Sequence, residues 1–182
     1  MLRRCVIIDN GTFQDIGGGV AGESPTVVEC VLAQNRAYEG GGAYRAFGPG
    51  TAIFVGCVIV GNQAGEGAKG AGLELTGPTN VADCLIADNA ITQGGMFANL
   101  GSGIFTFGAG VTITGSTIAD NQCTPSFFGP NTGGIVGPAT VVDCIVRGNC
   151  ELELDLATAT YSDVLGGWPG TGNFDADPLF VD

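Results

Sequence analysis

One six-residue pattern recurs along the chain and limits the fold more than any other feature. Each copy begins with Cys or Ser, continues with mostly apolar residues and has Asn at its sixth position. The copies are residues 5–10 (CVIIDN), 30–35 (CVLAQN), 57–62 (CVIVGN), 84–89 (CLIADN), 116–121 (STIADN) and 144–149 (CIVRGN). Their starts are 25, 27, 27, 32 and 28 residues apart. A constant unit with connections of variable length is typical of a solenoid, in which loops lengthen without moving the stacked strands.

Two further features repeat with the same period. The first is a Gly cluster followed by an apolar residue, at 17–20, 40–43, 70–73, 101–104 and 133–135. The second is an apolar column three residues before the Cys position: Leu2, Val27, Phe54, Val81, Ile113 and Val141. Three apolar patches per coil are too short for helices and suit strands of a few residues each. The 33 Gly residues and the charged fraction of only 13% also argue against helices.

The order of side chains within the repeat predicts which of them face the core. Counted from the Cys position as zero, positions 0 and +2 are small or aliphatic, whereas +1 and +3 include Thr117 and Arg147. Alternation along a strand places the even positions inside and the odd positions outside. The Asn residues, stacked at about 4.8 Å, are expected to form a hydrogen-bonded amide ladder and to adopt a left-handed turn conformation.

The sequence therefore predicts an all-β fold, namely a right-handed parallel β-helix (a single-stranded solenoid) of about six coils. Residues 1–150 form the coils, and residues 151–182 form the last coil and a C-terminal cap of the same domain. Leu152, Leu154 and Leu156 are expected to alternate along a last strand. The apolar cover is expected from Tyr161, Val164, Trp168, Phe174, Leu179 and Phe180. The first coil starts at once with Leu2 and Cys5, so we expect self-association through this uncapped coil, or attachment to further coils.

The pattern Cys-x-aliphatic-x-x-Asn with a Gly-Gly-apolar step resembles the right-handed parallel β-helix repeats of large bacterial surface and secreted proteins, including the polymorphic outer-membrane protein type. Residues 172–182 (GNFDADPLFVD) look like the segment that ends such helices in multidomain extracellular bacterial proteins. The resemblance implies an extracellular or cell-surface location. Since relatives usually continue past this segment, it also implies a fragment or a minimal version. The apolar run after Met1 is too short for a signal peptide.

Charge and composition exclude several classes of function. The net charge is −12, of which residues 151–182 carry −7, so phosphate backbones and anionic membranes are repelled and nucleic acid is not an expected partner. No stretch is long and apolar enough for membrane insertion. The chain has no His, which excludes Ser-His-Asp, Cys-His and His-metal chemistry. The Gly clusters recur in each coil and are interpreted as turns rather than as a phosphate-binding loop.

The seven Cys residues divide into two groups. Cys5, Cys30, Cys57, Cys84 and Cys144 form a column in which Ser116 takes the place of a sixth, and they are expected to pack as small apolar residues inside the coil. Cys123 and Cys150 lie outside the column in adjacent coils. Whether they form a disulfide is left open, because that requires suitable Cβ orientations as well as proximity.

Candidate functional residues lie in and beside the longest loops. Residues 90–100 and 122–132 are expected to emerge side by side and, with Tyr38, to offer aromatic and apolar side chains to sugar rings: Met96, Phe97, Phe127 and Phe128. The alternative is that these loops bury their own aromatics. Asp88 and Asp120 share the +4 position of consecutive coils, so their carboxylates are expected roughly 5 Å apart, as in a retaining glycosidase or a Ca²⁺ site. The alternative is plain turn chemistry, which Asp9 repeats without a partner.

The preferred interpretation is a non-catalytic β-helical scaffold, adhesion or glycan-binding module of a bacterial extracellular protein, with polysaccharide as the expected ligand and no cofactor. The rival interpretation is a carbohydrate-active enzyme, a polysaccharide lyase or glycoside hydrolase, using Asp88 and Asp120, with Ca²⁺ as the one metal considered. A third interpretation, an ice-binding surface, requires a flat, regular Thr array. It is not favoured, because Thr112, Thr114 and Thr117 fall in a single coil.

Overall fold

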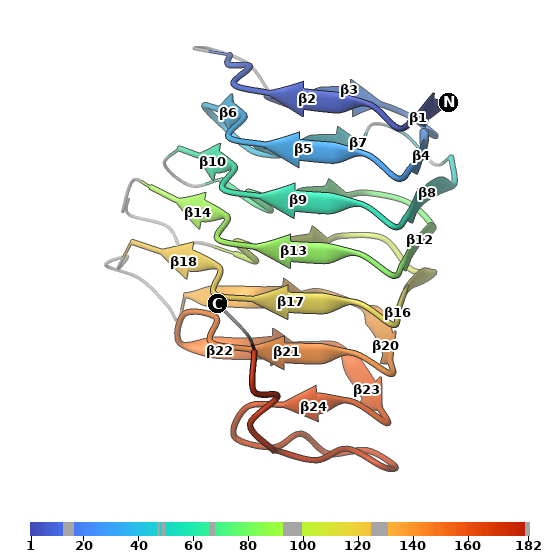
Figure 1. The fold of residues 1–182 in the computed structure, drawn as a ribbon, viewed down its shortest axis with the longest axis vertical. Coiled ribbons are helices and arrows are strands. Elements are labelled where there is room, and N and C mark those ends of the chain that lie inside the picture. Colours follow the sequence, from blue (N-terminus) through green and yellow to red (C-terminus); the bar gives the residue numbers. More distant parts are fainter. Residues whose placement is uncertain are drawn as a thin grey trace.

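The computed structural model describes residues 1–12, 17–46, 48, 50–65, 68–92, 100–124 and 131–180. Regular secondary structure in these residues consists of 24 β-strands in four sheets. In Figure 1 the chain crosses the front toward the left, returns behind and descends one level with each turn. This path is that of a right-handed parallel β-helix, as the repeats predict. Within the described residues, no helix has the length and apolar character needed to cross a membrane.

Each sheet takes one strand from successive coils, and neighbouring strands are parallel. Sheet A contains β1 (Leu2–Arg3), β4 (Thr26–Val28), β8 (Ala52–Val55), β12 (Thr79–Ala82), β16 (Val111–Thr114), β20 (Ala139–Val142) and β23 (Thr158–Thr160). Sheet B contains β2 (Val6–Ile8), β5 (Val31–Ala33), β9 (Val58–Val60), β13 (Leu85–Ala87), β17 (Thr117–Ala119), β21 (Ile145–Arg147) and β24 (Asp163–Val164). Sheet C contains β6 (Arg36–Ala37), β10 (Gln63–Ala64), β14 (Ala90–Ile91) and β18 (Gln122–Cys123). Sheet D contains β3 (Val20–Gly22), β7 (Tyr44–Ala46), β11 (Leu73–Leu75), β15 (Ile104–Thr106), β19 (Thr132–Val136) and β22 (Leu152–Asp155).

The core is built from three stacked columns of side chains, one from each large sheet. In sheet B the predicted alternation is confirmed: the +2 residues from Leu32 to Val146 are fully buried, and the +1 residues are at least partly exposed. The column three residues before Cys is buried from Val27 to Val141. Sheet D contributes Leu73 and its two register partners, Tyr44 and Ile104. The ring of Tyr44 lies 5.1 Å from that of Phe54. Each inner coil thus buries at least one large residue in each of these three sheets, which stabilises the stack through apolar contact.

The Asn ladder is present and is continuous from Asn10 to Asn149. The backbone N–H and the side-chain Nδ2 of each Asn donate to Oδ1 of the Asn in the next coil, at 2.8–3.2 Å. The expected left-handed conformation lies one residue earlier than predicted, at +4, where Asp88 and Asp120 both have φ of 54°. The Asn itself points inward, and the residue before it makes the corner.

The Gly clusters serve the ladder by allowing close approach. A Cβ at Gly72 would lie 2.4 Å from the carbonyl oxygen of Gly103 and 3.2 Å from Nδ2 of Asn89. A Cβ at Gly103 would lie 3.0 Å from Nδ2 of Asn121. Larger residues would push sheet D away from the ladder, which explains why Asn and Gly recur together.

The Cys column accepts hydrogen bonds in addition to packing. Cys84 donates its backbone N–H to Oγ of Ser116 at 3.1 Å, and Ser116 donates to Sγ of Cys144 at 3.5 Å. Ser therefore replaces Cys without loss of an acceptor. Burial raises the pKa of Cys144, so this thiol stays protonated and packs as a small apolar residue, as predicted.

The C-terminal end of the solenoid is closed by polar groups that end the two ladders. Glu153 accepts from the backbone N–H and from Nδ2 of Asn149, the latter at 2.6 Å, in the place of a further Asn. Cys144 donates its N–H to Oγ of Ser162, and Ser162 donates to Oδ1 of Asn173 at 3.0 Å. The strands β23 and β24 add a seventh rung to sheets A and B within the region predicted as cap.

The predicted apolar cover of this end is only partly correct. Val164 is fully buried and Trp168 packs against the core, and Leu154 alternates inward between exposed Leu152 and Leu156. The prediction is wrong for four residues that are more than half exposed: Tyr161, Phe174, Leu179 and Phe180. Closure comes from hydrogen bonds, including those of Arg147 to Asp163 and Asp175 at 2.9 and 2.7 Å. In Figure 1 the segment after β24 turns back across the front of sheet B.

The pH dependence of stability is expected to report the Glu153 cap. Burial raises the pKa of Glu153, although its bonds with Asn149 oppose the shift. The folded state therefore holds this proton more tightly than the unfolded state. The stabilisation is present below the usual Glu pKa and is lost as pH rises through the folded pKa. Urea denaturation should be measured from pH 4 to pH 8 for wild type and for Glu153→Gln, a variant that keeps a hydrogen-bond acceptor. As the pH rises, the free energy of unfolding of wild type should fall relative to that of the variant. Parallel curves for the two proteins would contradict this role.

The N-terminal end differs from the C-terminal end. Leu2, Cys5 and Ile7 are only partly buried, although they occupy the same columns as fully buried residues in the next coil. Val6 and Ile8 are 68% and 49% exposed. Self-association through this coil stays a prediction.

Candidate functional site

The corner between sheets B and C holds a hollow of about 690 Å³ at the first three coils. It is lined by Asp9, Asn10, Gly11, Thr12, Gln34, Arg36, Gly61 and Gln63. A volume of this size is in the range of small-molecule and oligosaccharide sites. This corner is the candidate functional site, and we call it the B/C groove.

Two repeat positions supply the side chains of the B/C groove. The first is the +4 residue with positive φ that ends each sheet B strand, represented by Asp9 and Gln34 with φ of 56° in both. The second is the residue that follows each ladder Asn, represented by Arg36 and Gln63, which pair in register in sheet C. Because the Asn before it points inward, this residue points outward. Gly61 at the third +4 position leaves the hollow open.

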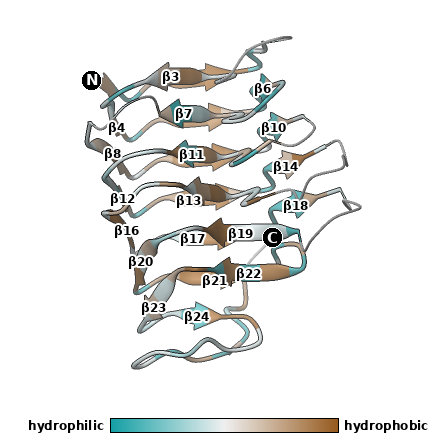
Figure 2. Cartoon of the chain, turned by 180° about the vertical axis from the view of Figure 1, so that it is seen from behind, coloured by the Kyte–Doolittle hydropathy of each residue, from teal (hydrophilic) through white to brown (hydrophobic). Residues whose placement is uncertain are grey.

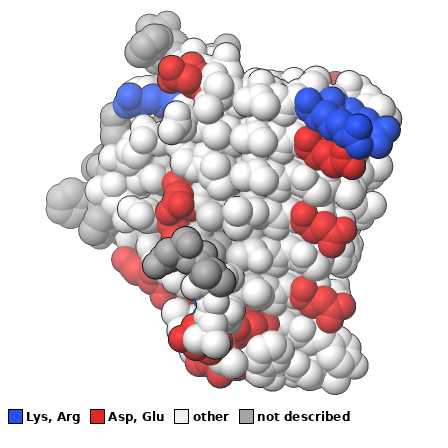
Figure 3. Space-filling model, in the orientation of Figure 1, with Lys and Arg blue, Asp and Glu red and all other residues white. Residues whose placement is uncertain are grey.

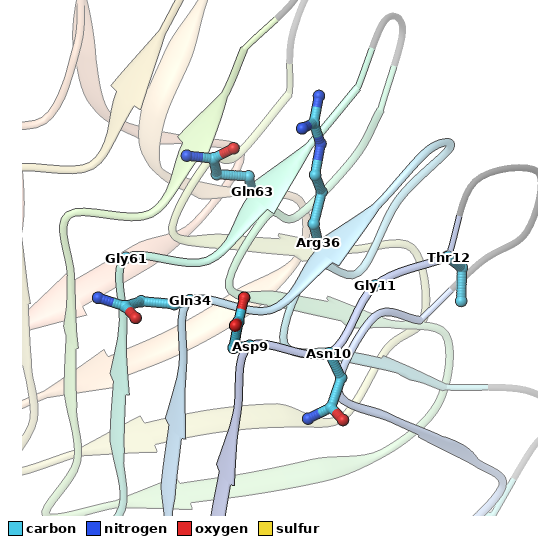
Figure 4. Close-up of a pocket in the computed structure, with 8 residues that line it drawn as sticks. All are labelled: Asp9, Asn10, Gly11, Thr12, Gln34, Arg36, Gly61 and Gln63. Atoms are coloured by element: carbon cyan, nitrogen blue, oxygen red, sulfur yellow. The ribbon is translucent and has the colours of Figure 1, made fainter.

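The polar side chains of the B/C groove are available to a ligand. Figure 4 shows Arg36 extending outward from β6 with Gln63 beside it, and Asp9 and Gln34 on the neighbouring turns. All four are exposed. Within the described ranges, none of these four side chains makes a hydrogen bond or ion pair. Two amides, a carboxylate and a guanidinium offer both donors and acceptors, which is the chemistry that sugar hydroxyls need.

Tyr38 is the one predicted aromatic contact that the structure describes, and it lies beside the B/C groove. It follows Arg36 by two residues and is 47% exposed. Its carbonyl oxygen accepts from the N–H of Gly65 at 3.1 Å, which fixes the backbone there. Tyr38 directly follows β6, which ends at Ala37 and carries the outward-facing Arg36 of the groove.

The four other predicted ligand contacts lie outside the described residues: Met96, Phe97, Phe127 and Phe128. The segments that hold them leave from the ends of β14 and β18, which are neighbours in sheet C. Tyr38 occupies the equivalent place after β6. The attachment points of the two loops are therefore side by side, as predicted, on the sheet that forms one wall of the groove.

Asp88 and Asp120 lie on the same corner, in the two coils that directly follow those of the groove. Their strands pair in register through Ala87 and Ala119, so the two residues are neighbours on adjacent coils. Both are exposed. A Cβ placed on Gly148 would lie 2.4 Å from Oδ1 of Asp120, so that carboxylate lies over the following coil, on the side away from Asp88.

Acidic side chains border sheet B on both sides. One row follows the corner between sheets A and B and includes Glu29, Asp83 and Asp143, with Arg4 hydrogen-bonded to Glu29 at its N-terminal end. The other row is the +4 column of the B/C corner. Figure 3 shows these rows along the long axis, with an uncharged band between them. In the part of the chain that the structure describes, no group of three or more Cys, Asp or Glu residues is placed to hold a metal ion.

A disulfide between Cys123 and Cys150 settles the question that the sequence leaves open. The Cα atoms are 6.0 Å apart. Cys150 donates its N–H to the carbonyl oxygen of Asn121 at 3.0 Å, so it takes the position of a next strand in sheet C. The disulfide thus closes sheet C next to the loop that follows β18.

A second charged cluster lies on sheet D, away from the groove. Arg45 Nε lies 3.2 Å from Oε2 of Glu74, and Nζ of Lys69 lies 5.1 Å from the ring centre of Phe105. Burial raises the pKa of Glu74, while Arg45 and Lys69 oppose the shift. Glu74 and Phe105 are both more than 90% buried, so this cluster packs the outer side of sheet D and is not open to a ligand.

Three residues of the groove, Gln34, Arg36 and Gln63, were missed by sequence reasoning. For Arg36 and Gln63 the available signal is the polar residue directly after the ladder Asn, which recurs at Gln122. Gln34 occupies the +4 position, one residue before the ladder Asn.

Comparison with protein-family models, with curated proteins and with solved structures gives no match to this chain. The assignment of function therefore depends on the geometry of the site.

Proposed function

We propose that the chain is a non-catalytic scaffold module of a bacterial extracellular or cell-surface protein, related to the polymorphic outer-membrane protein type of β-helix, that binds polysaccharide in the B/C groove. The observation that carries the proposal is a set of four exposed groove side chains that have no protein partner among the described residues: Asp9, Gln34, Arg36 and Gln63. Tyr38 adds a ring on which a sugar can stack. The groove runs along the solenoid axis, so successive coils meet successive sugar units.

The disulfide supports the proposed location. Disulfides persist in oxidising compartments and are rare in the cytosol. The Cys123–Cys150 bridge joins adjacent coils near the surface, whereas four of the five free Cys residues are buried.

A glycan array with purified wild type beside Arg36→Ala and Tyr38→Ala tests this proposal. Each variant removes one polar or stacking contact worth about 1–2 kcal/mol, so binding is expected to weaken by roughly 5- to 30-fold. Arg4→Ala, an exposed Arg on the opposite border of sheet B, is the matched control and should bind as wild type does. A Phe97→Ala/Phe127→Ala/Phe128→Ala variant extends the test to the loops.

Two outcomes would overturn this proposal. A folded wild type that binds no glycan would favour a scaffold without a ligand of its own. Cleavage of a bound polysaccharide, abolished in Asp88→Asn or Asp120→Asn, would favour the enzyme alternative, for which the two residues occupy the same corner of adjacent coils. Ca²⁺ is included in the assay because a carboxylate pair is a common part of its coordination.

A further inference from the structure

The outer face of sheet A is a regular surface that the B/C groove does not use. Its strands stack in one uninterrupted series, on the left side of the view in Figure 2. Two columns of side chains point outward. The first consists of Thr26, Ile53, Asn80, Thr112, Thr140 and Thr158, and the second of Arg3, Val28, Val55, Ala82, Thr114, Val142 and Thr160. Every one of these residues is at least partly exposed.

The Thr residues concentrate in the last three rungs. The last three residues of each of these strands point outward, inward and outward in turn. They are Thr-Ile-Thr in β16, Thr-Val-Val in β20 and Thr-Ala-Thr in β23. The sequence-based expectation that Thr is confined to one coil is therefore wrong. Thr112 pairs in register with Thr140, and Thr140 pairs with Thr158, whereas Thr117 faces outward from sheet B.

This face carries almost no charge. Arg3, at the N-terminal edge, is the only charged residue among the thirteen outward positions, although the chain carries 18 acidic groups. Six acidic residues stand instead on the two corners that border sheet B: Asp9, Glu29, Asp83, Asp88, Asp120 and Asp143. A face without ionic groups, aromatic rings or Arg in its centre lacks the residues on which protein interfaces usually depend.

The spacing of the outward side chains is set by the fold. Adjacent rungs are about 4.8 Å apart, and outward residues of one strand are about 6.6 Å apart. The pairing within sheet A contains no register shift. Thr is stiff at χ1, so its methyl and hydroxyl groups repeat with the backbone. The first column borders a shallow hollow of about 270 Å³ lined in part by Thr112, Thr140 and Thr158, which leaves their side chains open to solvent.

We propose that the outer face of sheet A binds ice. Both spacings are near those at which water oxygens repeat on a prism face of an ice crystal. The hydroxyls of Thr112 and Thr140 supply hydrogen bonds to that lattice, and Thr, Val, Ile and Ala methyl groups fill the spaces between water molecules. The Asn and Cys/Ser ladders behind the sheet hold the columns in place, so little order has to be gained on binding.

The proposal does not depend on glycan binding, because the two surfaces lie on different sheets. Nanolitre osmometry of the purified protein, which records thermal hysteresis and crystal shape, tests it directly. Wild type is expected to shape ice crystals and to hold their growth below the melting point. The double variant Thr112→Lys/Thr140→Lys places two long charged side chains in the array and is expected to reduce hysteresis to that of buffer.

The matched control is Thr117→Lys. Thr117 is partly exposed like Thr112 and lies only five residues away, but it points outward from sheet B. This variant should retain the hysteresis of wild type, and circular dichroism should show that all three proteins are folded. Absence of both hysteresis and crystal shaping in wild type would overturn the proposal. An equal loss in Thr117→Lys would also overturn it, because the activity would then not belong to sheet A.

Discussion

Replacing Asn62 by Leu is expected to lower the free energy of unfolding by about 3–5 kcal/mol, through the loss of several buried hydrogen bonds. Asn62 is fully buried in the middle of the ladder. Its Oδ1 accepts from the backbone N–H and Nδ2 of Asn35, both at 3.0 Å. Its own groups donate to Oδ1 of Asn89 and to the carbonyl oxygen of Leu32. Leu has a similar volume, so it leaves these partners unsatisfied without opening a cavity.

Urea denaturation followed by circular dichroism measures this effect. Gln63→Leu is the matched control, since Gln63 is the next residue in the chain but is exposed, and its change should stay within about 0.5 kcal/mol. A loss of that small size for Asn62→Leu would show that the ladder contributes little and that apolar stacking alone holds the coils.

The sequence was sufficient for the coil because stacking imposes the same demand at each level. Position +2 must fill the core at Ile59 and at Ile86 alike, and position +5 must both accept and donate at Asn62 and Asn89. A requirement repeated six times is visible as a pattern in one sequence. The same reasoning explains why Ser116 was recognised in the Cys column.

Features that depend on the pairing of strands were less visible. Thr112 and Thr140 are 28 residues apart in the chain. They are neighbours on sheet A because of the register in which β16 and β20 pair, which no local sequence pattern indicates. The positive φ at Asp88 was assigned to the following Asn because both residues suit a turn. At the C-terminal end, the fold uses single residues such as Glu153 and Asn173, which occur once and therefore leave no periodic signal.

Reducing the Cys123–Cys150 disulfide is expected to lower the free energy of unfolding by about 3.5 kcal/mol, because the bridge closes a loop of 27 residues and so restricts the unfolded chain. The bridge lies at the end of sheet C, where Cys150 stands in for a fifth strand. Urea denaturation with and without dithiothreitol measures the change.

The double variant Cys123→Ser/Cys150→Ser separates this bridge from the other thiols. It should match reduced wild type in stability and should not respond to dithiothreitol, because the five remaining cysteines are free thiols in the column. A further loss on reduction of the variant would mean that column thiols also pair. If the variant instead matches reduced wild type, the two sets of Cys have different roles: the column residues contribute packing and hydrogen-bond acceptors inside the coil, whereas the surface pair ties the end of β18 to the sixth coil beside the B/C corner. If dithiothreitol does not change the free energy of unfolding of wild type, the bridge does not contribute to stability, and the Asn ladder alone would hold that corner.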